Sequence, residues 1–321
     1  MAELVSILIP VYNCARWVER AIESALSQNW PKKEVIILDD ASTDGTSDLL
    51  KKWDGRVRLE RVSSNQGSNP SRNTLTAMSS GAWLLYLDAD DELAPDAVEA
   101  KMSYAEAADV IYGTSDICAY EGGELARTVR SDPVRTVDPF TAAFQWRYPN
   151  TSALMFRRSA VFDVGGWDDR FQNCTDYDLY FRLLLAGKRF VGAPESVSMY
   201  RIWSRNQMAY QNPLRLASSQ LEVMWQAVLE LERRDQLTPA IREAFSNTAL
   251  SAIRTVYPFD RGRALAEHKR LTTWHPKLIL SPKYFSKEFR MGYQIFGLRG
   301  AEVLARATRR LRQLSQKTLF T

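Results

Sequence analysis

The 321-residue chain contains only three cysteines and two histidines, and it has no long apolar run. Cys14, Cys118 and Cys174 are odd in number and scattered, which argues against a disulfide framework and favours a reduced, cytoplasmic protein. His268 and His275 both lie in the tail and are poor catalytic candidates. No apolar stretch approaches the ~20 residues that a membrane-spanning helix needs. The opening segment MAELVSILIPVYN has no basic region and no small-residue cleavage site, so we expect no signal peptide.

A glycine-rich phosphate loop is also missing. The first apolar run is followed by PVYNCARW, which lacks the Gly-x-Gly-x-x-Gly turn of a dehydrogenase that binds NAD. A sugar nucleotidyltransferase should carry a comparable loop after its first strand. Both classes are therefore disfavoured.

The net charge of +4 is distributed unevenly along the chain. Residues 261–321 contain 14 Lys and Arg against three Glu, a balance of +11, which leaves −7 for residues 1–260. An acidic front and a basic tail imply different partners. No recognised nucleic-acid module accompanies the basic tail, so we expect no nucleic acid partner there. An anionic membrane surface or a lipid-linked anionic substrate fits better.

The first 110 residues alternate between apolar runs of strand length and segments of helical periodicity. Near-continuous Val, Ile and Leu runs separated by helices predict an α/β fold with a mainly parallel, twisted sheet flanked by helices, similar to a Rossmann fold. The expected strands are 5–10, 34–38, 57–62, 82–87, 153–156 and 190–191, and the expected helices are 15–28, 46–53, 68–80 and 178–186.

After about residue 205 the pattern changes to helices, so we expect a first domain at 1–205 and a helical, basic extension at 206–321. Asn212-Pro213 and Thr238-Pro239 each resemble an N-cap followed by proline at the first helical position. Residues 301–314 have apolar side chains at helical spacing, with arginines mostly on other faces. This helix either packs on the first domain or lies on an anionic membrane.

Three carboxylates, Asp88, Asp90 and Asp91, directly follow the apolar run WLLYL. At the carboxyl end of a strand their mutual repulsion falls when a divalent cation lies between them, and carboxylate oxygens suit Mg²⁺ or Mn²⁺. A solvated acidic turn is the alternative. Asn13 and Asp39-Asp40 also fall at expected strand ends, where ligands bind in parallel sheets, so these motifs are interpreted as one site.

Two further groups of residues are candidates for ligand binding and catalysis. Asp40 can accept the N–H of a nucleobase or a ribose hydroxyl, and Arg72 can pair with a diphosphate or lie across a base. Asp176 stands at the start of the helix DLYFRLLLAG, where a carboxylate is either an N-cap or a general base facing a cleft.

The ordered motifs SILIPVYN, EVIILDDASTDGT, NQGSNPSRN, GAWLLYLDADDEL and TDYDLYFRLLLAGKRF together resemble the family 2 glycosyltransferases of GT-A fold. The resemblance extends over roughly the first 200 residues, to Tyr200-Arg201. It implies an inverting, metal-dependent transfer of a sugar from a nucleotide-diphosphate sugar to an acceptor hydroxyl. UDP is the expected nucleotide, with dTDP and GDP as alternatives, and the expected pathways are cell-surface polysaccharide, lipopolysaccharide or glycoconjugate synthesis.

The resemblance also implies roles for particular residues. Asp176 would be the general base, and Asp90 would bind Mg²⁺ or Mn²⁺, with Asp91 sharing the metal. Trp167, Asp168 and Arg201 are candidate contacts to the acceptor or the diphosphate. The expected nucleotide-binding residues are Pro10, Tyr12, Asp40, Arg72 and Asp88.

Two positions depart from the family pattern. Thr175 stands where the family has a Glu before the base, and Trp203 stands where a His often follows the Tyr-Arg pair. Loss of that His removes a usual diphosphate or metal contact, for which Arg201 or Arg205 could supply charge. A non-catalytic protein of the same fold that binds sugar nucleotides is the alternative function. We expect the chain in the cytoplasm, at the inner face of the cell membrane when it meets a lipid-linked acceptor.

Overall fold

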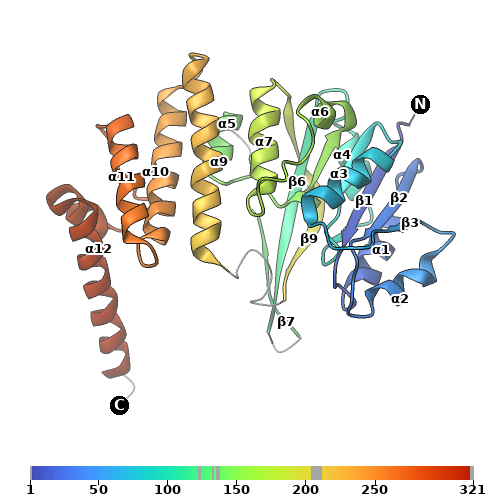
Figure 1. Cartoon of the computed structure of the whole chain (residues 1–321), viewed down its shortest axis with the longest axis horizontal. Helices are drawn as coiled ribbons and strands as arrows, with labels where there is room; N and C mark the ends of the chain where they lie inside the picture. The colour runs from blue at the N-terminus through green and yellow to red at the C-terminus, as the bar shows by residue number, and fades with distance from the viewer. Residues whose placement is uncertain (1, 122–123, 132–133, 135–137, 204–211, 319–321) are drawn as a thin grey trace. The chain divides into compact units, whose positions relative to one another are not determined.

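A computed structural model of the chain describes residues 2–121, 124–131, 134, 138–203 and 212–318 (Figure 1). The chain divides into two compact units, Met1–Gln211 and Asn212–Thr321. The boundary expected from the sequence, near residue 205, lies outside the described residues.

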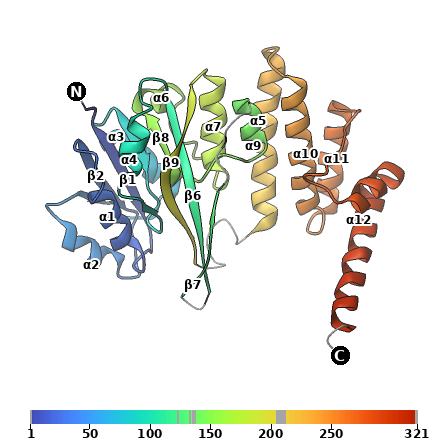
Figure 2. The same cartoon turned by 180° about the vertical axis from the view of Figure 1, so that it is seen from behind.

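Within the described residues, the first unit is built on one nine-stranded sheet, in the order β3-β2-β1-β4-β8-β6-β9-β5, with β7 paired to β6. β3, β2, β1 and β4 are parallel to one another, as the sequence predicts. The second half is mixed, because β8 runs antiparallel to both β4 and β6 while β6 and β9 are parallel (Figure 2). The strands are β1 Val5–Val11, β2 Lys33–Asp39, β3 Arg58–Arg61, β4 Trp83–Tyr86, β5 Glu92–Leu93, β6 Val110–Glu121, β7 Glu124–Arg130, β8 Leu154–Arg157 and β9 Phe190–Ile202.

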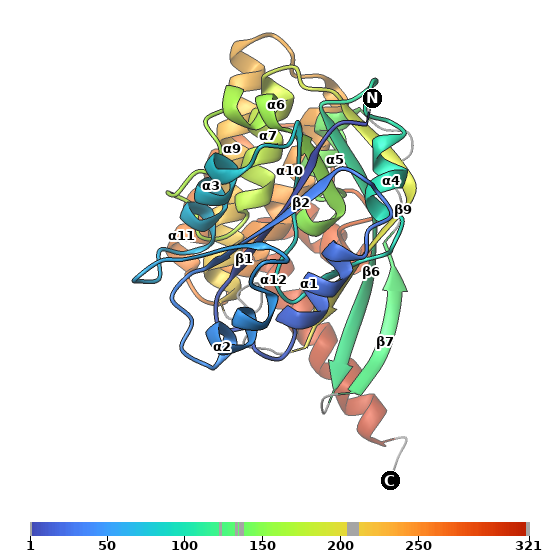
Figure 3. The same ribbon diagram turned by 90° about the vertical axis from the view of Figure 1, so that its right-hand side faces the viewer.

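Helices cover both faces of this sheet, with α1 and α4 on one side and α3 and α7 on the other (Figure 3). On one face, Val5, Ile7 and Ile9 of β1 form a buried cluster with side chains of α1 and α4. On the opposite face, the Tyr86 hydroxyl lies 2.6 Å from the Thr76 hydroxyl of α3. The helices of this unit are α1 Val18–Leu26, α2 Thr46–Leu50, η1 Lys51–Trp53, α3 Ser68–Met78, α4 Ala97–Met102, α5 Pro139–Phe144, η2 Thr151–Ala153, α6 Arg158–Asp163 and α7 Thr175–Leu185.

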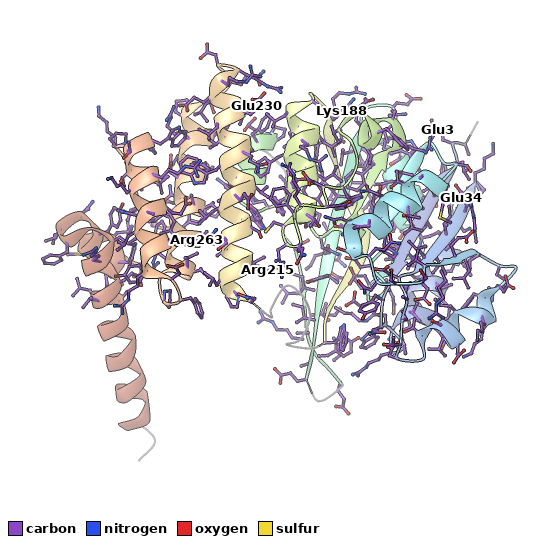
Figure 4. All side chains as sticks on the ribbon, viewed as in Figure 1. Glu3, Glu34, Lys188, Arg215, Glu230 and Arg263 are labelled. Carbon is purple, nitrogen blue, oxygen red and sulfur yellow. The ribbon has the colours of Figure 1, made fainter. Side chains whose placement is uncertain are left out.

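The two ends of the parallel strands have different chemistry. At the amino end of β2, the Glu34 side chain (Figure 4) accepts hydrogen bonds from the Ser6 hydroxyl at 2.5 Å and the Ser80 N–H at 2.7 Å, so it ties chain segments together. At the carboxyl ends of β1, β2 and β4 lie Tyr12, Asp40 and the acidic loop 88–91. Because these strands are parallel, their carboxyl ends meet at one edge, where ligands bind in α/β sheets.

The second unit consists of four helices in its described residues, α9 Pro213–Arg233, α10 Pro239–Val256, α11 Arg261–Trp274 and α12 Lys287–Thr318. Both expected caps are present: the Asn212 side chain accepts from Arg215 N–H at 2.9 Å, and Thr238 Oγ1 accepts from Ile241 N–H at 3.2 Å. Among the described residues, no helix has the length and apolar character needed to cross a membrane.

Candidate active site

The first wall of the site follows β1. Pro10 is half-buried on the strand, and Tyr12, just beyond it, is 49% exposed. Asn13 adopts a left-handed conformation with φ of 48°, and its side-chain oxygen accepts the Thr43 N–H at 2.7 Å. This bond ties the loop after β1 to the loop after β2, so the Tyr12 ring is presented at the carboxyl edge of the sheet.

Asp40 joins the loop after β2 to the loop after β3. Its carboxylate is almost fully buried and accepts the N–H groups of Gln66 and Gly67 at 2.8 and 2.9 Å. The neighbouring Asp39 has a local role, because its carboxylate accepts the Ser42 N–H at 2.9 Å and lies 3.5 Å from the Arg61 guanidinium. The two adjacent acids therefore have different roles, and Asp40 is the one that holds the loop after β3.

Arg72 connects three parts of the site. It projects from α3, is buried, and donates to Asp88 Oδ1 at 2.7 Å. Its guanidinium carbon lies 4.6 Å from the centroid of the Trp167 ring, within the range of a cation–π interaction. Burial raises the pKa of Asp176, and the positive charge of Arg72 partly opposes that rise, so the structure brings these four sequence-predicted residues together.

Asp176 lies in the first turn of α7 and is half-buried. Burial raises the pKa of this carboxyl above the ordinary aspartate value, against the Tyr177 N–H and Arg72, which lower it. The negative charge of Asp88 raises it further. A carboxyl group with a raised pKa, close enough to other charged groups to respond to them, is a candidate general base.

Asp178, one position further on but on another side of the helix, is engaged elsewhere. It is buried and pairs with Arg182 at 2.6 Å, one turn along α7. This i, i+4 pair stabilises the helix itself, so of the two acids Asp176 alone belongs to the group around Arg72.

The loop that carries Trp167 and Asp168 is fixed by α3. Asn73 Nδ2 donates to the Trp167 carbonyl at 2.8 Å, and Asn73 Oδ1 accepts the Trp167 N–H at 2.8 Å. Asn69 Nδ2 donates to the Asp168 carbonyl at 2.7 Å. Trp167 is 2% exposed, and the Asp168 carboxylate pairs with Arg170, whose hydrogen bonds lower the pKa of Asp168. Of the two side chains expected to contact the acceptor or the diphosphate, Trp167 is therefore packed against Arg72 and Tyr86, and Asp168 is paired within its own loop.

The three acids of the loop after β4 occupy distinct environments. Asp88 is half-buried and pairs with Arg72, as above. Asp91 is 0% exposed, and its carboxylate accepts from Asn150 Nδ2 at 2.9 Å, Ser152 Oγ at 2.6 Å and the Arg201 N–H at 3.1 Å. Burial, and then the charges of Asp90 and Asp88, raise the pKa of Asp91 well above its usual range.

Asp90 faces the end of β9. The Trp203 indole donates to Asp90 Oδ2 at 2.9 Å, and Arg201 Nη1 donates to the Asp90 carbonyl at 2.9 Å. Arg201 is 2% exposed, pairs with Glu92 and lies 4.8 Å from the Trp17 ring centroid. Its charge is therefore satisfied inside the fold. Arg205, the other cation expected near a diphosphate, lies outside the described residues.

The donor set for a divalent ion is small. Among the described residues, no group of three His, Cys, Asp or Glu side chains could hold a metal ion. Mg²⁺ commonly binds through one or two carboxylates plus substrate phosphates and waters. The carboxylates of Asp90 and Asp88 fit that pattern, whereas a complete metal cage built by protein alone does not.

The sequence did not identify several residues that hold the site. Asn150 and Ser152 fix Asp91 from about sixty positions away, and Asn69 fixes the Asp168 loop from a distance of 99 residues. No local pattern marks such pairs. Trp203 was recognisable only as a departure from the family motif, and its contact with Asp90 gives that departure a structural meaning.

Comparisons with known proteins identify the family of the chain. Residues 6–165 match the model of glycosyl transferase family 2. A chondroitin synthase of Pasteurella multocida (strain Pm70) is 30% identical over 193 residues, covering 58% of this chain and 19% of that protein. The Escherichia coli UDP-Glc:alpha-D-GlcNAc-diphosphoundecaprenol beta-1,3-glucosyltransferase WfaP is 34% identical over 115 residues, covering 36% of this chain and 46% of that protein. The chain thus matches less than half the length of either relative.

Solved structures show the same fold. S. aureus TarS (residues 1–349) superposes with a TM-score of 0.66 at 14% identity, covering 96% of this chain and 91% of that one. The mannosyltransferase PcManGT from Pyrobaculum calidifontis, solved with GDP-Man and Mn²⁺, gives a TM-score of 0.54 at 19% identity, covering 86% of this chain and 82% of that one. With the family match over residues 6–165, these findings show that the chain belongs to glycosyl transferase family 2 and has its GT-A fold.

Proposed function

We propose that the first unit transfers a sugar from a nucleotide-diphosphate sugar to an acceptor hydroxyl, with inversion at the anomeric carbon. The observation that carries this proposal is the position of Arg72, which pairs with Asp88 at 2.7 Å and acts by its charge on Asp176. Donor-side and acceptor-side groups thus meet around one cation, at the edge of the sheet where ligands bind.

The donor nucleotide is proposed to lie between the loops after β1 and β2. Tyr12 offers an exposed ring for a base, Pro10 lies beside it, and Asp40 holds the Gln66–Gly67 backbone that would line the pocket. We propose UDP as the nucleotide. In support, TarS has been solved with UDP-GlcNAc, although PcManGT holds GDP-Man.

Asp90 is the metal ligand that we propose, with Asp88 at the same edge and the donor diphosphate completing the coordination. A bound Mg²⁺ or Mn²⁺ would neutralise charge on the leaving diphosphate. We assign Asp91 a positioning role in place of a metal contact, because its buried carboxylate already accepts from Asn150, Ser152 and the Arg201 backbone. Trp167, Asp168 and Arg201 are likewise proposed to hold the walls of the site.

Asp176 is the proposed general base. Its carboxylate takes the proton of the acceptor hydroxyl while that oxygen forms a bond to the anomeric carbon. The bond from that carbon to the diphosphate oxygen breaks, and its electron pair leaves with the diphosphate. The raised pKa of Asp176 makes the carboxylate a stronger base than an exposed aspartate.

The acceptor is proposed to be a saccharide or a lipid-linked saccharide in polysaccharide or glycoconjugate synthesis. The name of the relative WfaP, which acts on a diphosphoundecaprenol-linked sugar, supports the lipid-linked form. We propose that the enzyme works in the cytoplasm, at the inner face of the membrane when the acceptor is lipid-linked, with an anionic membrane surface as its partner.

A screen of nucleotide sugars for Mn²⁺-dependent release of nucleoside diphosphate tests the function. One donor should be hydrolysed slowly without acceptor, and Asp90→Ala should abolish that release. Asp176→Asn should retain donor binding and lose transfer to an acceptor. A protein that binds donors but releases nothing under any condition would be a sugar-nucleotide-binding protein, the alternative function.

A further inference from the structure

Helix α12 carries apolar side chains on two sides. On its inner side Phe289, Leu298 and Ala301 are each no more than 2% exposed. The Arg254 guanidinium of α10 lies 3.7 Å from the Phe289 ring centroid and pairs with Glu302 at 2.5 Å, so this side is packed within the second unit.

The outer side of α12 is apolar as well. Met291 is 52% exposed and Ile295, one turn later, is 66% exposed. The helix kinks at Gly297, which has φ of 62° and ψ of −166°. We use the name outer face of α12 for three exposed apolar residues, Met291 and Ile295 before the kink and Val303 after it. Apolar side chains exposed together on a surface mark a contact site for a protein or a membrane.

Positive charge accompanies the outer face. The exposed Lys287 and Arg299 each stand one helical turn before an outer-face residue, Met291 and Val303 respectively. Residues 287–318 contain eight Lys and Arg against two Glu, a balance of +6. One of those acids, Glu302, is already paired with Arg254. Apposing this helix with its own copy would bring two strongly positive segments together, whereas an anionic lipid surface would neutralise them.

We propose that the outer face of α12 lies in the interface of an anionic bilayer, with its apolar side chains at the acyl boundary and its cations among the headgroups. A helix with this combination binds in the plane of the membrane without crossing it. The proposal names the residues that would bind the membrane. It rests on the proposed function in one respect, because a lipid-linked acceptor is what would bring the enzyme to a membrane.

Co-sedimentation of the full chain with lipid vesicles tests the proposal. Wild-type protein should sediment with vesicles that contain phosphatidylglycerol, remain in solution with phosphatidylcholine alone, and be released by salt. The double variant Ile295→Ser/Val303→Ser should reduce the partition coefficient about tenfold or more, because it removes apolar side chains from the buried side. Lys287→Glu/Arg299→Glu should lower it on anionic vesicles by a comparable factor.

Leu229→Ser is the matched control, since Leu229 is 41% exposed on α9 of the same unit and should leave vesicle binding unchanged. Circular dichroism melting curves show whether each variant is folded. Equal binding by wild type and folded Ile295→Ser/Val303→Ser would overturn the proposal. So would a dimer in sedimentation velocity that dissociates in this variant while vesicles bind neither protein. Donor hydrolysis without vesicles is measured separately, so a failure of the proposed function is distinguishable from a failure of membrane binding.

Discussion

The indole N–H of Trp203 donates a hydrogen bond to Asp90 Oδ2 at 2.9 Å. Trp203 follows β9, and Asp90 follows β4, so the bond closes the site across two strands that are not neighbours in the sheet. It holds one oxygen of the Asp90 carboxylate and fixes the direction of the other. Where the family often has a histidine, this chain therefore uses a tryptophan to orient the proposed metal ligand.

Trp203→Phe should weaken Mn²⁺ binding because the Asp90 carboxylate loses its orienting donor. Removing a hydrogen-bond partner of a metal ligand typically lowers metal affinity by about 10- to 100-fold. We expect a loss of about tenfold for Mn²⁺ in the presence of UDP, measured by the free Mn²⁺ signal in electron paramagnetic resonance. Trp203→His, which restores an N–H donor, should recover part of the affinity.

Trp17→Phe is the control for the Trp203 variant. The Trp17 ring lies 6.4 Å from the Trp203 ring, and among the described residues its buried indole N–H has no hydrogen-bond partner. This substitution removes an indole from the same aromatic group without touching Asp90. If both variants bind Mn²⁺ equally well, or lose affinity equally, Trp203 does not act through its hydrogen bond.

Asp176→Asn should lower kcat by about 10²- to 10⁴-fold, the usual contribution of a general base, with little change in donor binding. Because burial raises the pKa of Asp176, the wild-type rate should fall on acidification at a pH above the ordinary aspartate value, as the base becomes protonated. The pH dependence of kcat/KM measures this acidic limb. Asp169→Asn is the control, because Asp169 is an exposed aspartate seven residues before Asp176. It should leave both kcat and the pH dependence of kcat/KM unchanged. If Asp176→Asn has the kcat of the wild type, another residue is the general base.

The fold was largely predictable because its first half follows rules that act over short distances. Parallel strands buried on both faces are continuous apolar runs, so β1, β2 and β4 were recognised within a few residues of their observed ends. β7 was missed since all seven of its residues are exposed, which leaves no apolar alternation to detect. β6 and the short β5 were missed as well, because they form strands by pairing with β9, whose residues are far away in the chain.

The sequence predicted which residues lie at the candidate site, but not how deeply each is buried or which hydrogen bonds it makes. The sequence placed Asp88, Asp90 and Asp91 together at a strand end, but it could not distinguish them. That distinction depends on Ser152 and on Arg201, which is 110 positions from Asp91 along the chain. The environment of a carboxylate depends on tertiary contacts. Those contacts bury Asp91 and occupy its carboxylate with hydrogen bonds, although its sequence neighbours Asp88 and Asp90 look similar.

Arg72 should control the pH profile through its charge. Arg72→Gln removes a cation that lowers the pKa of Asp176, so that pKa should rise and the acidic limb of kcat/KM should move to higher pH. Arg72→Lys keeps the charge and should leave the limb near its wild-type position. Both variants lose the planar guanidinium between Asp88 and the Trp167 ring, so both should lose activity, by about tenfold or more. Identical acidic limbs in the two variants would contradict an electrostatic role.

The loop that carries Trp167 offers a test of how the site wall is held. Gly165 and Gly166 have nearly equal φ values of 78° and 74°, but their surroundings differ. A Cβ on Gly166 would lie 2.6 Å from Asn73 Oδ1, whereas a Cβ on Gly165 would have no neighbour within 4 Å among the described residues. Asn73 Oδ1 is the atom that accepts the Trp167 N–H.

Gly165→Ala should therefore cost only the backbone strain of a left-handed alanine, about 1 kcal/mol of unfolding free energy. Gly166→Ala carries the same strain and also displaces Asn73, so a further ~1–3 kcal/mol should be lost as the Trp167 hydrogen bonds break. Asn73→Ala should match this second contribution by itself. Chemical denaturation of the three variants gives the comparison. Equal destabilisation by the two glycine substitutions would mean that the loop yields without disturbing Asn73, and that Trp167 is held in place by its packing against Arg72 and Tyr86 alone.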